Sequence, residues 1–292
     1  MKKKGLLICN TVLKDGKFQE IHDLYIASAK KLNIDLKVIA NDQIITFIDQ
    51  NKMQISNMDL IDFVIFLDKD IKLAKAIESM NIPVFNNSRV IEICDSKIKT
   101  HMELYDIPAP KTLFAPSIFF HDLSNNHEFL ALLKQQLTYP MVVKEEFGSF
   151  GNQVYLVHND EELIQLQKQL GAKPHLYQEF IQESSGCDLR VQMVGNEIVA
   201  CVKRQAHDDF RSNATLGGSM YQFELEQTYI DFAKQIQARL KADFCGIDLL
   251  ITKNGPLLCE VNSNAHVKNL METTGINVCD KIMEYIYEKV YA

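Results

Sequence analysis

Residues 244–264, FCGIDLLITKNGPLLCEVNSN, constrain this chain more than its other stretches do. They read as two apolar strands joined by a tight turn, and three oxygen-bearing side chains, Asp248, Glu260 and Asn262, lie inside those strands. A carboxylate on a buried strand is costly unless another group compensates its charge. The pattern therefore predicts a β-hairpin that holds a divalent cation.

The register of this hairpin decides whether the three side chains meet. A three-residue loop, Lys253-Asn254-Gly255, with glycine in the left-handed position, places Asp248 directly opposite Glu260. Opposite residues point to the same face of a sheet, and Asn262 shares that face by the period of two. Two carboxylates and an amide oxygen suit Mg²⁺ or Mn²⁺, and nucleotide phosphates and water would complete the coordination shell.

Two alternatives remain open for the same residues. A two-residue loop, Asn254-Gly255, would place Asp248 opposite Val261 and turn Glu260 away from the site. The hairpin could instead be an edge pair whose charges face water. Because its other positions are almost all apolar, the sequence favours the cation site over the solvated edge.

Composition narrows the class of protein. The chain has 292 residues, 47% hydrophobic and 24% charged, which is typical of a globular protein of two or three domains. A net charge of −7 argues against nucleic-acid binding by phosphate neutralisation. Seven cysteines without a CxxC pair indicate reduced thiols and a cytoplasmic location. The first apolar run is too short for a signal peptide, and no run approaches the ~20 residues of a membrane span.

Strand and helix patterns alternate from residue 5 to residue 92, which predicts a parallel sheet flanked by helices. Strands are expected at 5–9, 36–40, 63–67 and 83–85, and helices at 18–32 and 70–80. The sequence Cys9-Asn10-Thr11-Val12 after the first strand lacks the GxGxxG fingerprint of a dinucleotide site. The loop at 14–17 is expected at the strand ends, where such sheets bind ligands, although a solvated turn would look the same.

Two short helices follow the parallel-sheet region. Residues 87–105 read as two helical pieces with Ser88 and Ser96 as N-caps, and Lys97 follows the second cap. A solvated basic face is the alternative for the lysines of this segment. Two prolines then predict a linker at residues 106–112.

A glycine-bearing loop joins two strands in the middle of the chain. The strand at 139–144 ends in Lys144, the loop Gly148-Ser149-Phe150-Gly151 follows, and the next strand is expected at 153–157. Glycines let backbone N–H groups approach anionic oxygens, and the lysine adds a point charge. This arrangement suits the covering of phosphates and differs from the Walker pattern. A plain hairpin turn would look similar.

Taken in order, these motifs resemble the ATP-grasp superfamily, and specifically its RimK-type amino-acid ligases. The motifs that match are YPMVVK, QEFI, GCDLR, KRQA, DFRSN, GIDLL, EVNSN and TTGINV, from about residue 93 onward. The resemblance implies an α/β (α+β) chain with the ATP-grasp fold. Its expected parts are a Rossmann-like parallel-sheet lobe at 1–92, a central lid subdomain at 93–180, and a C-terminal subdomain with the metal site at 181–292. The last two would grip ATP.

The resemblance also implies which residues act on the reacting groups. Lys144 would contact the nucleotide phosphates, and Arg204 would stabilise charge in the transition state. Two Mg²⁺ (or Mn²⁺) ions would be held by Asp248, Glu260 and Asn262. The implied activity is that of an ATP-dependent carboxylate–amine ligase: a carboxylate attacks ATP to give an acylphosphate and ADP, and an amine then gives an amide and phosphate.

Other matched residues would bind the nucleotide. Lys97 would reach the phosphates from the preceding helix, and Asp188 would contact the sugar side. Adenine would lie against Glu179 and the backbone of Phe180 and Ile181. The phosphates would be bordered by Gly148, Ser149, Gly151, Arg211, Ser212 and Asn213.

Two departures from the family pattern concern the helix start and the substrates. The family usually has Asp-Lys where this chain has Ser96-Lys97, and often a Pro-Gly turn where this chain has residues 263–268. The segment 263–268 is expected to face the amino acid being added, and His266 to act by hydrogen bonding or on the substrate side. Glutamate is the family default for that amino acid, and the departure leaves its identity open.

Several functions stay open beside glutamate ligation onto a peptide or small molecule. They are a lysine- or arginine-pathway ligase, a peptide-tailoring ligase, a kinase or thiol-ester-forming enzyme, and a non-catalytic nucleotide-binding protein. The expected partners are an amino acid and an amine or carboxylate acceptor, without nucleic acid or membrane. The family's frequent dimers and tetramers leave a homo-oligomer open.

Overall fold

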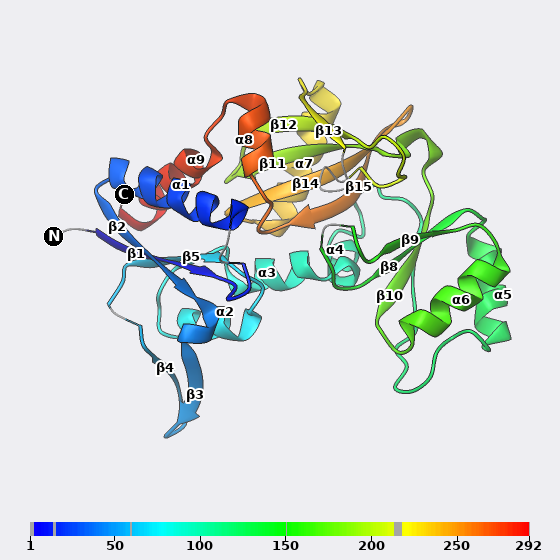
Figure 1. Cartoon of the computed structure of the whole chain (residues 1–292), viewed down its shortest axis with the longest axis horizontal. Helices are drawn as coiled ribbons and strands as arrows, with labels where there is room; N and C mark the ends of the chain where they lie inside the picture. The colour runs from blue at the N-terminus through cyan, green and yellow to red at the C-terminus, as the bar shows by residue number, and fades with distance from the viewer. Residues whose placement is uncertain (1–2, 14–15, 59, 150, 213–217, 292) are drawn as a thin grey trace.

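Three sheets packed with helices, and a further two-stranded hairpin, make up the computed structural model, which describes residues 3–13, 16–58, 60–149, 151–212 and 218–291. Figure 1 shows the N-terminal sheet at one end of the molecule, the central sheet at the other, and the C-terminal sheet between them. Helices and both parallel and antiparallel strands occur, so the predicted mixed α/β class is confirmed.

The N-terminal sheet is parallel, in the order β2-β1-β5-β6. Its strands are β1 (Lys3–Cys9), β2 (Ile34–Ala40), β5 (Phe63–Leu67) and β6 (Val84–Phe85), and its helices are α1 (Lys17–Lys31) and α2 (Ile71–Glu78). All five residues of β5 are buried, as expected for a parallel strand covered on both faces. The predicted alternation is confirmed, with element ends shifted by a few residues.

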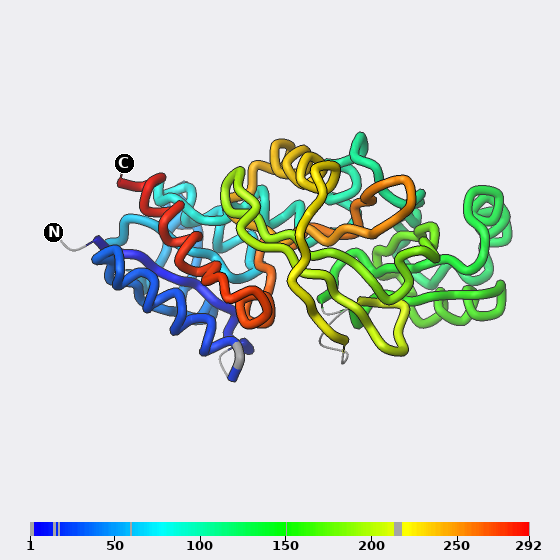
Figure 2. Tube along the Cα trace, turned by 90° about the horizontal axis from the view of Figure 1, so that it is seen from above, coloured from blue at the N-terminus to red at the C-terminus, as the bar shows by residue number. Residues whose placement is uncertain are grey.

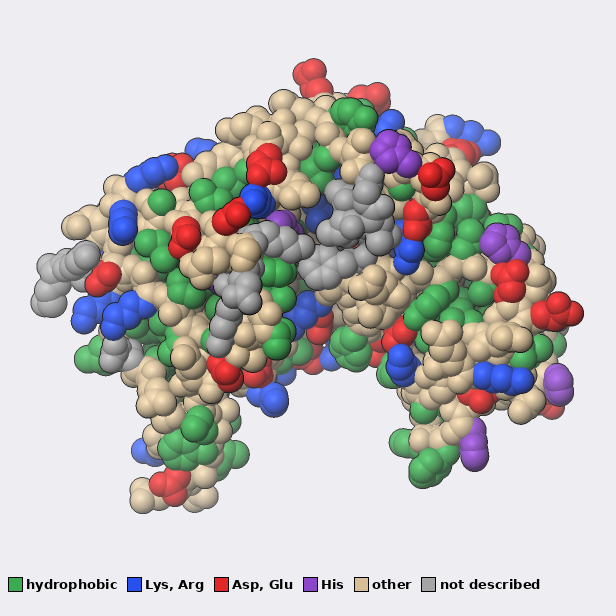
Figure 3. All heavy atoms as spheres, viewed as in Figure 1, with side chains coloured by type: hydrophobic (Ala, Val, Ile, Leu, Met, Phe, Trp, Pro, Cys, Tyr) green, Lys and Arg blue, Asp and Glu red, His purple; other side chains and the backbone are tan. Residues whose placement is uncertain are grey.

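A hairpin of β3 (Ile45–Asp49) and β4 (Lys52–Ser56) projects from this lobe and was not predicted. Figures 1 and 3 show it extending away from the rest of the molecule, with hydrophobic side chains on its surface. Ile45, Phe47 and Ile48 are all exposed. Because Ile45 and Phe47 fall on one face of the strand and Ile48 on the other, the apolar residues do not mark a single face, and no strand was predicted there.

Helices α3 (Ser88–Asp95) and α4 (Lys97–Glu103) confirm the predicted two-piece segment. Ser96 caps α4, since its Oγ accepts a hydrogen bond of 3.0 Å from the Lys99 N–H. The prediction that Ser88 caps α3 is wrong. The cap is Asn87, which has extended backbone angles and accepts from the Val90 N–H at 3.0 Å, whereas Ser88 already lies in the helix.

The central sheet is antiparallel, in the order β7-β10-β8-β9. Its elements are β7 (Thr112–Phe114), α5 (His127–Gln136), β8 (Met141–Glu145), β9 (Val154–Val157), α6 (Asp160–Leu170) and β10 (His175–Glu179). Buried Leu133, Leu166 and Tyr177 join the two helices to the sheet in one apolar cluster. Helix α5 begins at His127, where the Asn126 side chain caps it.

The C-terminal sheet has the order β13-β12-β11-β14-β15 and is antiparallel. Its elements are β11 (Cys187–Val194), β12 (Glu197–Gln205), β13 (Ser219–Gln222), α7 (Gln227–Leu240), β14 (Phe244–Thr252) and β15 (Gly255–Asn262). Strand β13 was not predicted, nor was the short helix α8 (Lys268–Thr274) that packs near it. Short 3₁₀ turns lie at Asn41–Gln43 and Gln182–Ser184.

The β14–β15 hairpin confirms the predicted pairing of Asp248 with Glu260, but by a different route. Thr252 pairs with Gly255, so neither of the loops considered from the sequence is correct. The register then shifts by one residue between Leu249 and Asp248, and Cys259 is the extra residue on β15. This β-bulge places the Glu260 side chain on the same face of the sheet as Asp248. A two-residue turn without the bulge would place it on the opposite face.

The last helix, α9 (Val278–Tyr291), returns to the N-terminal lobe. Figures 1 and 2 show it beside α1, and an ion pair of 2.7 Å joins Lys31 to Asp280. Tyr25 of α1 and Ile286 of α9 belong to one buried cluster with Val202 of β12. The first lobe thus shares its core with the C-terminal subdomain, and the boundaries expected at residues 92 and 180 stay a prediction.

All seven cysteines are free thiols, with no disulfide among them. Within the described ranges, no helix combines the length and apolarity needed to cross a membrane.

Asp243, just before β14, makes stability depend on pH. Burial raises the pKa of its carboxyl to about 6, although Tyr285, whose hydroxyl donates to Oδ1 at 3.0 Å, favours the ionised form. The folded state therefore holds this proton more tightly than the unfolded chain does. The resulting stabilisation is complete below pH 4 and is lost as the pH rises through about 6.

We expect Asp243→Asn to remove this dependence. Between pH 4 and pH 7, the free energy of unfolding of the parent protein, measured with urea, should fall by up to about 3 kcal/mol more than that of the variant. Parallel curves for the two proteins over this range would contradict the prediction.

Candidate active site

One cavity of about 290 Å³ is lined by residues from all three sheets. It brings together the sequence-predicted residues that the structure describes, whatever their position in the chain. They are Lys97, Lys144, Gly148, Ser149, Gly151, Glu179, Phe180, Ile181, Asp188, Arg204, Arg211, Ser212, Asp248, Glu260 and Asn262. The predicted Asn213, and Phe150 of the glycine loop, lie outside the described residues.

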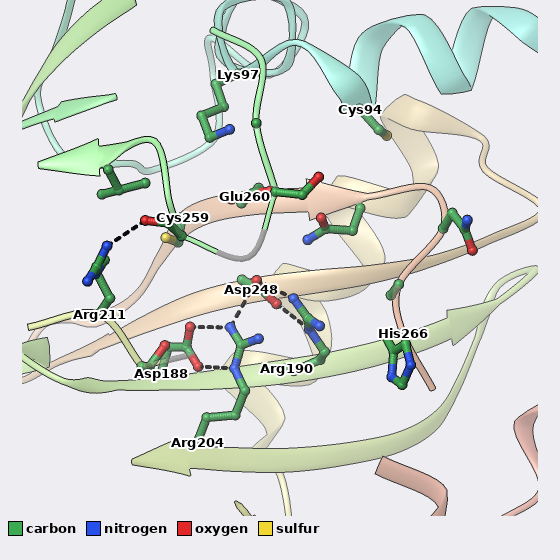
Figure 4. A pocket seen from close by; sticks show the side chains of 18 of the residues that line it. Cys94, Lys97, Asp188, Arg190, Arg204, Arg211, Asp248, Cys259, Glu260 and His266 are labelled. Carbon is green, nitrogen blue, oxygen red and sulfur yellow. Dashed lines mark hydrogen bonds and ion pairs between the residues drawn. The ribbon is translucent and has the colours of Figure 1, made fainter. Parts of the chain in front are cut away.

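A buried network of charges forms the floor of the cavity (Figure 4). Arg204 on β12 donates to both carboxylate oxygens of Asp188 on β11, and its Nη2 lies 2.9 Å from Oδ2 of Asp248. Arg190, also on β11, donates to both oxygens of Asp248 at 2.7 Å. Adjacent strands place these residues side by side, because Asp188 pairs with Arg204 and Arg190 with Asp248 in the sheet.

This network fixes the protonation of its members. Burial alone would favour a neutral Asp248, but Arg190 and Arg204 hold the pKa of that carboxyl below its usual value. Burial likewise disfavours the charged form of Arg204, yet Asp188 and Asp248 raise its pKa well above the usual value. Since Arg204 occupies both oxygens of Asp188, the expected contact of Asp188 with the nucleotide sugar stays a prediction.

The predicted cation ligands have suitable chemistry. Asp248 and Glu260 are paired across β14 and β15, and Asn262 pairs with Gly246, which adds no side chain beside it. The Glu260 carboxylate makes no hydrogen bond or ion pair within the described part of the chain, and the Asn262 Nδ2 atom is buried without a partner. The described residues contain no cluster of three His, Cys, Asp or Glu side chains placed to hold a metal. A cation here would take two carboxylates and one amide, a donor set that fits Mg²⁺.

Two buried lysines face the cavity opposite this floor. Lys97 starts α4 and Lys144 lies on β8, and each is less than 8% exposed. No carboxylate of the described residues lies within 4 Å of either ammonium group, and the Lys144 Nζ donates to the Cys259 Sγ at 3.9 Å. Burial, reinforced by the charge of Lys144, lowers the pKa of Lys97, while Glu260 acts in the opposite direction.

The glycine loop between β8 and β9 is held from two sides. Arg211 donates from Nη1 to the Gly151 carbonyl at 2.7 Å, and Lys69 of the first lobe donates to the Ser149 hydroxyl at 3.2 Å. At its base, Lys97 N–H donates to the Glu146 carbonyl at 3.0 Å. The loop is therefore placed over the cavity by groups from both neighbouring subdomains.

A less polar end of the cavity lies at the end of β10, where adenine was predicted. Glu179 ends this strand and is exposed, and its backbone N–H donates to the Lys111 carbonyl at 2.9 Å. The ring of Phe180 meets that of Phe210 edge-to-face at 6.3 Å. Val142 and Leu250 add apolar surface to the lining. This end suits a flat aromatic ring.

Several lining residues were missed from the sequence. Arg190 is one, although its position two residues after Asp188 on a strand places it on the same face. Cys259 was predicted only to be a reduced thiol, and it lies at the bulge beside the cavity. Burial raises the pKa of its thiol to about 11, so it is not ionised at neutral pH. Ile21, His22 and Tyr25 of α1 carried no local signal, because tertiary packing brings α1 to the cavity.

Comparison with known proteins agrees with this geometry. Residues 96–286 match the family model described as a RimK-like ATP-grasp domain. An uncharacterised MG012 homologue of Mycoplasma pneumoniae is 31% identical over 246 residues, covering 82% of this chain and 84% of that protein. A probable alpha-L-glutamate ligase of Vibrio atlanticus is 32% identical over 219 residues, covering 73% and 70%.

The fold has solved counterparts. A RimK-domain ATP-grasp protein of Sphaerobacter thermophilus superposes with a TM-score of 0.72 at 17% identity, covering 97% of this chain and 98% of that one. The predicted ATP-grasp fold is therefore confirmed.

Proposed function

The chain belongs to the RimK-like ATP-grasp family of carbon–nitrogen ligases, and on that premise we propose that it joins a carboxylate to an amine through an acylphosphate. ATP would be cleaved to ADP and phosphate in the course of the reaction. The substrates proposed are an amino acid and a peptide or small-molecule partner.

The observation that carries this proposal is the pair of buried lysines. An ammonium group buried without a carboxylate partner is costly, and Lys97 and Lys144 also repel each other across the cavity. A polyanion bound between them would remove both costs. The glycine loop beside Lys144 also lines the cavity, and its backbone would approach the same anion closely, as expected for the phosphates of ATP.

In the first step, a substrate carboxylate attacks the γ-phosphorus of ATP, and the bond to the β-phosphate oxygen breaks to release ADP. Both reactants are anions, so their repulsion must be offset. Lys144 and Lys97 would carry part of the phosphate charge, and the Arg204 guanidinium would stabilise the charge that spreads over the transferring group. Asp188 holds Arg204 in a fixed orientation for this role.

Asp248, Glu260 and Asn262 would hold the Mg²⁺ ions, whose contribution is to neutralise phosphate charge and orient the triphosphate. Of the two carboxylates, Glu260 is the more available, because two guanidinium groups already share Asp248.

In the second step, the amine attacks the acyl carbon, the amide bond forms, and phosphate leaves. Water would compete for the same carbon. The glycine loop, tethered by Arg211 and Lys69, would cover the acylphosphate and exclude water from it. No single general base is assigned to deprotonate the amine.

Relatives named glutamate ligases make glutamate the first amino acid to test. A lysine- or arginine-biosynthesis type of ligase, or a peptide-tailoring one, is the alternative. The test is release of ADP and of phosphate from Mg·ATP across a library of amino acids and amines, with mass spectrometry of the products. Release of ADP without phosphate would indicate a kinase, and release of neither would contradict a ligase.

Replacing Lys97 should weaken nucleotide binding but stabilise the ligand-free protein. Lys97→Met should weaken binding of Mg²⁺ with a non-hydrolysable ATP analogue by about tenfold or more, because a charged contact is lost. It should also raise the melting temperature of the ligand-free protein, because an unpaired buried charge is removed. Calorimetry and thermal unfolding measure the two effects.

Lys234→Met is the matched control, since Lys234 is exposed on α7. It should change neither quantity. A Lys97→Met protein that melts lower and binds the analogue normally would contradict the assignment of Lys97 to the phosphates.

A further inference from the structure

The cavity continues beyond the charged floor into the N-terminal lobe. There it ends among six side chains that we call the apolar arm: Cys9, Ile21, His22, Tyr25, Leu67 and Val267. They come from the ends of β1 and β5, from one face of α1, and from the segment after β15. All six are less than 9% exposed, so this end of the cavity is enclosed.

A contact between two rings borders the arm. Phe18 of α1 and His266 of the segment after β15 meet edge-to-face, with ring centroids 5.8 Å apart and an interplanar angle of 87°. Figure 4 shows that His266 lies apart from the Asp248–Arg204 network, on the far side of Arg190. The segment at 263–268, which departs from the family pattern, thus contributes both Val267 and His266 to this region.

The charges of the cavity lie elsewhere. Its described cations are Lys69, Lys97, Lys144, Arg190, Arg204 and Arg211, none of which belongs to the arm. Of these, Lys69, Arg190, Arg204 and Arg211 already pair with carboxylates. Within the arm, burial lowers the pKa of the His22 imidazole, so this ring is neutral at pH 7. The described arm therefore offers apolar surface, one neutral imidazole, the Tyr25 hydroxyl and the Cys9 thiol, and no lysine, arginine or carboxylate.

We propose that the apolar arm receives an uncharged aliphatic or aromatic side chain of one of the two substrates and rejects a carboxylate there. This inference rests on the proposed function and narrows its substrates. The adenine end, the lysines and the cation ligands account for the nucleotide, which leaves the arm for a group that ATP does not carry. A glutamate side chain in the arm would be a buried carboxylate among side chains that include no lysine or arginine.

The test compares two amino acids of similar length that differ in charge. L-norleucine and L-glutamate are titrated into the full chain with Mg²⁺ and a non-hydrolysable ATP analogue, each with a free and with an acetylated amine. Norleucine should bind about tenfold tighter or more, in at least one of the two forms, because its side chain loses no charge solvation. Equal binding, tighter glutamate binding, or no detectable norleucine binding overturns the proposal.

A pair of variants tests the location of the site. Leu13 lines the cavity near the arm, whereas its neighbour Val12 is 80% exposed and does not line it. Leu13→Lys should reduce or reverse the preference for norleucine, and Val12→Lys, which adds the same charge outside, should leave it unchanged. An unchanged preference in folded Leu13→Lys, or an equal change in both variants, counts against the arm.

The outcome separates this inference from the proposed function. Tighter binding of norleucine, without release of ADP and phosphate from any substrate pair, would contradict the proposed ligase activity and support the apolar arm as a side-chain site. Turnover together with tighter binding of glutamate in both forms would support the ligase activity and contradict the proposed role of the apolar arm.

Discussion

Glu260→Ala is expected to abolish ATP turnover while the protein stays folded. Glu260 is partly buried on β15 and pairs with Asp248 across the hairpin. It has no ion-pair partner within the described residues, so its removal leaves no cation without its carboxylate. Its removal would take away one of two carboxylates from the proposed Mg²⁺ site, and with it charge stabilisation that matters in the transition state. We expect ADP release to fall by at least about 100-fold.

The matched control is Glu224→Ala, because Glu224 is exposed after β13. It should retain parent activity. The melting temperature of Glu260→Ala should stay close to that of the parent. Turnover within a few-fold of the parent protein would defeat the assignment of Glu260 to the metal.

Arg204→Met is expected to cost about 3–5 kcal/mol of unfolding free energy, a much larger structural effect. Arg204 is 4% exposed and is the partner of both Asp188 and Asp248. Methionine fills a similar volume but leaves Asp188 buried without its cation. Urea denaturation at pH 7 measures the loss.

Two further variants identify the cause. Lys203→Met removes a cation one residue away that is only partly buried, and it should change stability by less than about 0.5 kcal/mol. Adding Asp188→Asn to Arg204→Met should recover part of the loss, because the stranded charge is removed. An Arg204→Met protein as stable as the parent would show that the network is not a buried charge cluster.

The pairing of Asp248 with Glu260 was predicted correctly from the sequence, but for an incomplete reason. Apolar patterning identified β14 and β15, and the period of two placed Asp248, Glu260 and Asn262 on one face. The turn was wrong, and a bulge at Cys259 restored the pairing. A bulge has no reliable signature in one sequence, since it depends on how the strand meets its neighbours.

Other parts of the site depended on tertiary structure. Lys144 and the glycine loop could be predicted because they are adjacent in the chain. Arg190 could have been, from its spacing to Asp188. The apolar arm could not, because Ile21 and Tyr25 form the ordinary apolar stripe of a helix until α1 packs against the segment that carries Val267. The β3–β4 hairpin was missed since it buries no apolar face.

The most direct test of this account is a crystal structure with Mn²⁺ and a non-hydrolysable ATP analogue. We predict anomalous scattering from Mn²⁺ within coordination distance, about 2.0–2.3 Å, of oxygens from residues 248, 260 and 262, with the analogue's phosphates between Lys97 and Lys144. Bound analogue with those three side chains apart, and no anomalous signal among them, would contradict the account.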